Sequence, residues 1–211
     1  QQVRFVDGAV FPLRGVATRI VHAPGIRGVV CLSTDETGDR KMYVAGEAAH
    51  VERRVQDWLK AQARIELVAA VRKYSEMVGK APPPITLRDT TTRWGSCSAA
   101  GALNFSWRLI LAPGEVLTYL AAHEVCHLVH MNHSARFWKL CRSICPETDR
   151  AEQWLKSNGL DLYLEYLYGT RQQSGFNFET GAAGAGTSIT ASFAGTATGS
   201  AGPTWSEAGL T

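Results

Sequence analysis

Four of the six histidines in this 211-residue chain fall within eleven consecutive positions, in the pattern HExxHxxxxxH. His123 and His127 are four residues apart, so on a helix they project from one face about one turn apart. Both imidazoles can then approach a single ion at the distance of about 2.0–2.1 Å that is typical of zinc–nitrogen bonds. This segment is therefore predicted to form a helix that presents two histidines to the same point.

A third histidine, His133, follows His127 by six residues. It can reach the same ion if the helix ends and the chain turns back across the site. Asn132 fits such a turn because asparagine tolerates left-handed backbone geometry. Three neutral imidazoles leave the fourth position of a zinc ion open for water or substrate, as catalysis requires. The sequence thus predicts one Zn²⁺ per chain, held by His123, His127 and His133.

Glu124 directly follows the first ligand and can face a water bound to the zinc. Zinc lowers the pKa of that water toward about 7, and a nearby carboxylate can then take its proton as the general base. Chance produces HExxH in roughly one chain in a hundred of this composition, and the added His133 lowers that to roughly one in four thousand. The pattern favours a zinc-dependent hydrolase, with peptide hydrolysis first, over a buried helix whose histidines bind no metal.

His130 is predicted to lie near the ligands, as is Asn132, rather than to bind the metal itself. The ligand spacing equals that of the metzincin proteases, which carry glycine at the position of His130 and a methionine turn after the third histidine. No methionine follows Met131 in this chain. A different zinc-hydrolase architecture is therefore expected.

The remaining patterning predicts an α+β fold. A small antiparallel sheet is expected at the N-terminus, and then one long amphipathic helix whose apolar stripe runs through Val55, Ile65 and Val68. A β-hairpin is expected over 85–111, with a turn at 95–101, and then a helix that is opened by Pro113 and reaches the histidines. Two short helices follow, one at 134–145 that is capped by Ser134 and one at 149–157 that ends before Gly159.

The composition divides the chain into three parts. Residues 1–45 are expected to be a β-rich segment and residues 46–168 the zincin-like core. Residues 169–211 are expected to be a flexible tail, because positions 181–204 carry no charge and 13 of these 24 are Gly or Ala. Such a segment buries too little apolar surface to offset the entropy of ordering it.

Net charge and cysteine content restrict the binding partners and the cellular compartment that are expected for this chain. The net charge of +3 is too small to indicate nucleic-acid binding, which stays open only as a possibility. Five scattered cysteines without CxxC spacing suggest reduced thiols and a cytoplasmic location. No apolar run of about 18 residues occurs, so no membrane span is expected. Oligomeric state is left undetermined.

Beyond the histidines, a longer set of motifs resembles the YgjP-like metallopeptidase family over roughly residues 3–167. The matching segments are RWGSCS at 93–98, Trp107-Arg108, HEVCHL at 123–128, and Asn132-His133-Ser134 followed by Phe137-Trp138. The resemblance implies a compact zincin-like domain, related in motif to the SprT-like and WLM peptidases. It also implies zinc on the three histidines and a catalytic Glu124, with a peptide or protein as the substrate.

Two other functions are kept open. The first is a metal-dependent nucleotide phosphohydrolase, since that role has been attached to some members of the family, although no GxxxxGK[ST] loop is present. The second is a non-catalytic module that binds nucleic acid or protein and keeps a vestigial zinc site.

The RWGSCS segment has both a structural and a functional interpretation. Trp94 and Trp107 are expected to pack the hairpin, and Gly95 to form a turn. Arg93 and Arg108 could instead hold a substrate carboxylate or a developing oxyanion, because a hairpin just before the metal helix can form the edge of a peptide cleft.

Overall fold

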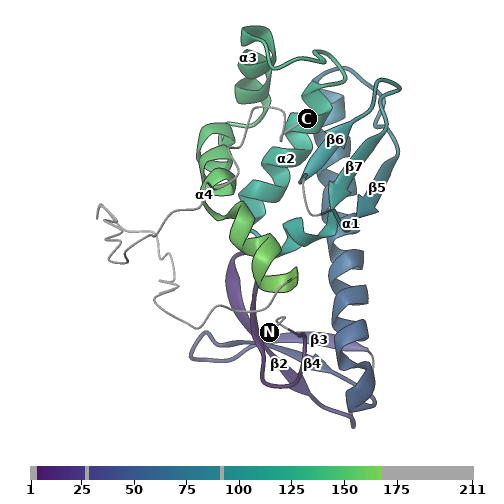
Figure 1. Ribbon diagram of the computed structural model, residues 1–211, viewed down its shortest axis with the longest axis vertical. Coiled ribbons are helices and arrows are strands. Elements are labelled where there is room, and N and C mark those ends of the chain that lie inside the picture. Colours follow the sequence, from purple (N-terminus) through teal and green to yellow (C-terminus); the bar gives the residue numbers. More distant parts are fainter. Residues whose placement is uncertain (1–3, 27–28, 91–92, 168–211) are drawn as a thin grey trace, which may run out of the picture.

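The computed structural model describes residues 4–26, 29–90 and 93–167 (Figure 1). It confirms the α+β class. A four-stranded sheet forms the lower part of the molecule in Figure 1, and a three-stranded sheet with three helices forms the upper part. The predicted tail, 169–211, lies outside the described residues, and the boundaries proposed at 45 and 168 stay a prediction.

The first sheet contains β1 (Val10–Leu13), β2 (Val16–His22), β3 (Val30–Thr34) and β4 (Arg40–Val44), in the order β1-β2-β4-β3. It is mixed, and the expectation of a purely antiparallel sheet was wrong. β2 and β4 pair in parallel, whereas β1 with β2 and β3 with β4 are antiparallel. The reason is that the β3–β4 hairpin folds back so that β4, the second strand, takes the place next to β2.

A short 3-10 turn, η1 (Ala48–His50), leads into α1 (Val51–Met77), the long helix that runs from the first sheet to the second (Figure 1). The helix is confirmed, but its buried face follows Val55, Leu59, Ala63 and Leu67 at four-residue spacing. Ile65 and Val68 instead face solvent, with 61% and 47% exposure. They were wrongly placed on the core stripe, because a step of ten residues from Val55 to Ile65 turns about 80° away from the buried face at 3.6 residues per turn.

The second sheet contains β5 (Ile85–Arg88), β6 (Gly95–Cys97) and β7 (Leu103–Ser106), in the order β5-β7-β6. A hairpin is present, but it joins β6 to β7, and β6 lies within the stretch 95–101 that was predicted as the turn. β5, at the start of the predicted first strand, pairs in parallel with β7 instead of forming the hairpin. Part of the predicted turn is thus a strand, and the predicted second strand was too long. Gly95 begins a strand rather than a turn, and residues 107–111 form a 3-10 helix, η2 (Trp107–Leu111), rather than the end of a strand.

The tight turn between β1 and β2 joins the two halves of the molecule. Arg14 and Gly15 both have positive φ, 52° and 75°, as a two-residue hairpin of type I′ requires. Their backbone N–H groups donate to the carbonyls of Ile110 and Leu111, at 2.9 and 3.0 Å. A Cβ on Gly15 would lie 3.2 Å from Cα of Pro113, the residue that caps α2. The turn therefore packs directly against the start of the histidine helix.

Three helices complete the upper part: α2 (Gly114–Cys126), α3 (Ala135–Ile144) and α4 (Thr148–Leu167). Ser134 caps α3 as predicted, accepting a hydrogen bond from the Phe137 N–H at 3.4 Å. α4 is longer than expected and continues through Gly159. A Cβ at Gly159 would lie 3.0 Å from Nε1 of Trp94, so this glycine serves close packing rather than helix termination.

A hydrophobic core extends through both parts, from Phe11 and Ile20 of the first sheet to Leu120 of α2 and Leu155 of α4. Within the described ranges, every helix is too short or too polar to cross a lipid bilayer. The fold thus places α2 at the centre, between β6 on one side and α4 on the other (Figure 1).

Candidate metal centre

The three predicted ligands converge. The ring centroids of His123, His127 and His133 lie 4.8 to 5.0 Å apart in all three pairs. Each ring offers a nitrogen, and the three nitrogens lie within 4.8 Å of one another. His123 and His127 are buried, whereas His133 is partly exposed. The three imidazoles thus form a triangle in which His133 is the ring that is partly exposed to solvent.

The chemistry of this donor set fits a zinc ion. A tetrahedral zinc places its ligand nitrogens about 3.3–3.4 Å apart. Nε2 of His123 and Nε2 of His133 are 3.0 Å apart. Nε2 of His127 is buried and has no hydrogen-bond partner among the described residues, so its lone pair is available to an ion. Burial lowers the pKa of His127, which favours the neutral form that binds metal.

The local fold explains the convergence. His123 lies in the last turn of α2, and His127 is its C-terminal cap. The backbone then closes in tight turns, with the N–H groups of Val129 and His130 both donating to the carbonyl of Cys126. These turns bring the chain back, and His133 lies directly before the capped start of α3. The predicted return of the chain is therefore present.

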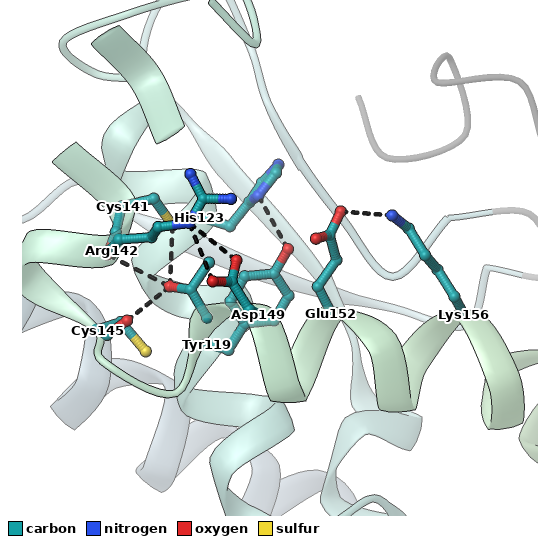
Figure 2. Close-up of polar contacts among 9 residues, drawn as sticks. Tyr119, His123, Cys141, Arg142, Cys145, Asp149, Glu152 and Lys156 are labelled. Carbon is teal, nitrogen blue, oxygen red and sulfur yellow. Dashed lines mark hydrogen bonds and ion pairs between the residues drawn. The ribbon is translucent and has the colours of Figure 1, made fainter. Parts of the chain in front are cut away.

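Neighbouring groups orient two of the rings. Nδ1 of His127 donates to the backbone carbonyl of His130 at 3.1 Å, which leaves Nε2 as the metal-facing nitrogen. The Tyr119 hydroxyl lies 3.4 Å from Nδ1 of His123, one helical turn away on α2 (Figure 2). In the tautomer that frees Nε2, Nδ1–H of His123 donates to this hydroxyl. Tyr119 lies four residues before His123, and this spacing could have predicted the contact from the sequence.

Aromatic rings from α3 support the triangle. Phe137 lies 4.6 to 4.9 Å from all three histidine rings and stacks on His127. Trp138 stacks on His133 at 5.7 Å. α3 is tied to α4 by the ion pair of Arg142 with Asp149, 2.9 Å (Figure 2). Phe137-Trp138 was given only as part of the motif shared with the family, and its contact with the histidine rings was missed.

Glu124 is fully buried beside the first ligand. Both of its carboxylate oxygens lack a hydrogen-bond partner among the described residues, and burial raises its pKa well above the usual range. A Cβ on Gly95 would lie 2.5 Å from Oε1 of Glu124. Gly95 of β6 thus leaves the room that the carboxylate occupies. Burial, and then the charge of Glu124, raises the pKa of Cys97 to about 11.

The other predicted site residues lie in different settings. Arg108 is buried, and its Nε and Nη2 donate to the two oxygens of Asp89 at 2.8 and 3.2 Å. Arg93 is exposed. Contact of either arginine with a substrate stays a prediction. His130 contributes through its backbone carbonyl. Asn132 lies exposed in the bend before His133, but without the left-handed φ expected for it, because Arg14 is the only described non-glycine residue with positive φ.

Fold and site together define an α+β domain with three converging histidines, two of them buried, that could hold a metal, beside a buried glutamate without a hydrogen-bond partner among the described residues. A profile of the family described as YgjP-like, metallopeptidase domain, matches residues 1–158. The chain belongs to this family. Searches of curated proteins and of solved structures found no significant match.

Proposed function

We propose that this chain is a zinc-dependent metallopeptidase that uses Glu124 as its general base. The observation that carries the proposal is the meeting of three imidazole nitrogens within 4.8 Å, directly beside a buried carboxylate that has no partner of its own among the described residues. Membership in a metallopeptidase family supports the same function. A purely structural metal site has no need of a buried glutamate that is left unpaired.

Each residue has a defined task in this proposal. A zinc ion, when bound, supplies a Lewis acid that polarises a carbonyl and makes water more acidic. His123, His127 and His133 would hold it through nitrogen. Glu124 takes a proton from the attacking water and returns it to the leaving amine. Its burial next to the ligands keeps this proton exchange away from bulk solvent.

A peptide suits the surroundings of the site. β6 is an edge strand of its sheet and packs against α2, the helix that carries Glu124. An extended peptide can add to such an edge through backbone hydrogen bonds. The strand that positions the carboxylate through Gly95 would then also position the scissile bond. We further infer a cytoplasmic location, because all five cysteines are free thiols.

The test compares two substrate classes under the same conditions. Zinc-loaded protein is incubated with a peptide library and, separately, with nucleoside triphosphates, each with and without a chelator. We expect peptide cleavage that the chelator abolishes and that added zinc restores. His123→Ala should lose both zinc and cleavage.

Other outcomes would replace the proposal. Chelator-sensitive hydrolysis of triphosphates without peptide cleavage would establish a phosphohydrolase. Peptide cleavage that persists in the chelator would exclude the metal mechanism. Cleavage of neither class by protein that holds stoichiometric zinc would favour a binding module.

A further inference from the structure

A cavity of about 440 Å³ lies between α1 and the edge strand β5. It is lined by residues from three segments: Lys60, Ala61 and Arg64 of α1, Leu87, Arg88 and Asp89 at the end of β5, and Trp107 of η2. The volume falls within the range of about 300–1,000 Å³ that is usual for small-molecule sites. None of the residues of the metal centre lines it.

Three cationic side chains, Lys60, Arg64 and Arg88, are among the residues that line this cavity. Lys60 and Arg64 are one turn apart on α1, and Arg88 lines the cavity from β5. In the described part of the chain, none of the three forms an ion pair or donates a hydrogen bond to a carboxylate. Lys60 lies over the ring of Trp107, with Nζ 5.7 Å from the centroid. Like charges gathered in a concave site raise the local concentration of anions.

Asp89, the acidic residue of the lining, does not cancel these charges. Arg108 engages both of its carboxylate oxygens, and the Arg108 guanidinium lies 4.8 Å from the centroid of the Trp107 ring. This pair is fixed by its two parallel hydrogen bonds and by the buried position of Arg108. The wall of the cavity therefore carries the charge of three cations that form no ion pair within the described ranges.

We propose that this cavity binds a small ligand through a phosphate group. A phosphate dianion has three terminal oxygens and two charges, which can be shared by two guanidinium groups and one ammonium group. A carboxylate has two oxygens and one charge, and a single guanidinium fork already satisfies it. The number of cations that line the cavity thus favours phosphate over carboxylate.

The site is distinct from the metal centre. β7 separates β5 from β6, so the two edges of the sheet are about 10 Å apart at the usual strand spacing. β6 packs against the metal-carrying helix α2, whereas the cavity opens at the β5 edge. A ligand in the cavity therefore occupies a position of its own.

The test uses calorimetric titration of the full zinc-loaded chain with pyrophosphate at constant ionic strength. The variant Lys60→Gln/Arg64→Gln removes two cations from the cavity. Its matched control, Arg72→Gln/Lys73→Gln, removes two exposed cations from the same helix outside the cavity. We expect pyrophosphate affinity to fall at least tenfold in the first variant and to stay within twofold of the wild type in the control. Arg88→Gln should weaken binding from the opposite wall.

Three outcomes would overturn the proposal. One is a wild-type chain that does not bind millimolar pyrophosphate. Another is the same affinity in the two double variants: an equal loss would indicate diffuse charge, and no loss in either would indicate binding elsewhere, such as at the metal. The third is malonate binding as tightly as pyrophosphate. A comparison of adenosine triphosphate with tripolyphosphate then identifies the source: tighter binding of the nucleotide indicates a nucleotide, and equal binding indicates the phosphate chain alone.

Discussion

Gly95 and Glu124 show how closely single residues define this site. The glycine lies on β6, and any side chain there would enter the space of the carboxylate, since a Cβ would be 2.5 Å from Oε1. The φ angle of Gly95 is not positive, so its backbone would accept alanine. The constraint comes entirely from the neighbouring carboxylate.

We therefore expect Gly95→Ala to displace Glu124 while leaving the three histidines in place. Peptide turnover should fall about 100-fold, because a shift of about 1 Å in a catalytic group has that effect, whereas zinc content should not change. Gly114→Ala is the matched control, since a Cβ there meets nothing within 4 Å. Equal turnover in the two variants would show that Gly95 does not position the carboxylate.

Phe137 provides a second test at this scale, because its ring contacts all three ligand rings. Phe137→Leu should weaken zinc affinity about 10- to 100-fold, as loss of groups that orient metal ligands does. Competition with a chromophoric chelator measures this. Phe11→Leu makes the same change in the first sheet, where Phe11 is equally buried. Zinc affinities that match between these variants would contradict the role of Phe137.

His123 and His127 could be predicted because their spacing alone implies a shared helix face. Glu124 and His133 could be added from their places within the pattern HExxHxxxxxH. Tyr119, four residues before His123, could have been assigned in the same way, but Gly95 and Phe137 could not. Gly95 meets Glu124 only through the packing of β6 on α2, and Phe137 meets the histidines only after the chain turns back. These contacts depend on tertiary structure that no local pattern specifies.

At the scale of elements, the turn between β1 and β2 holds the start of α2. Gly15 combines positive φ with close contact to Pro113. Gly15→Ala should reduce the free energy of unfolding by about 1–3 kcal/mol from backbone strain, plus a further loss from the clash. Urea denaturation measures both.

Gly8→Ala isolates the backbone term, because Gly8 has a similar φ of 79° but a Cβ there meets nothing within 4 Å. The difference between the two variants then reports the contact with Pro113. If both variants lose the same stability, the turn does not hold the histidine helix.

Sequence patterns predicted the helices better than the sheets, for a physical reason. Helix periodicity and capping are local, so α1 and the Ser134 cap of α3 were found. The parallel pairing of β2 with β4 joins strands that β3 separates in sequence, which no single segment encodes. The apolar run of η2 fits a short strand and a short helix equally well.

At the scale of the whole molecule, the metal centre couples to stability. The core reaches from the first sheet to α4, and the site lies within it with buried polar atoms of His127 and Glu124 that have no partner in the described part of the chain. A bound ion gives the His127 nitrogen a partner. Metal that binds only the folded chain stabilises it by mass action.

Chelation should therefore lower the melting temperature by about 5–10 °C, which corresponds to about 2.7 kcal/mol at a hundredfold excess of metal over Kd. Calorimetry with chelator, and again after zinc is restored, measures the shift. His133→Ala serves as the control and should respond weakly to either treatment. A wild-type melting temperature that is the same with chelator and with zinc would contradict the coupling.

The central claim is that three histidines hold a zinc ion for chemistry in which Glu124 moves the proton. The most direct measurement is zinc content together with peptide turnover in the wild type and in Glu124→Gln, which keeps the shape of the side chain and removes its basicity. The account predicts one zinc per chain in both proteins and turnover in the wild type alone. Turnover by Glu124→Gln at the wild-type rate, or a wild-type chain that binds no zinc, would contradict it.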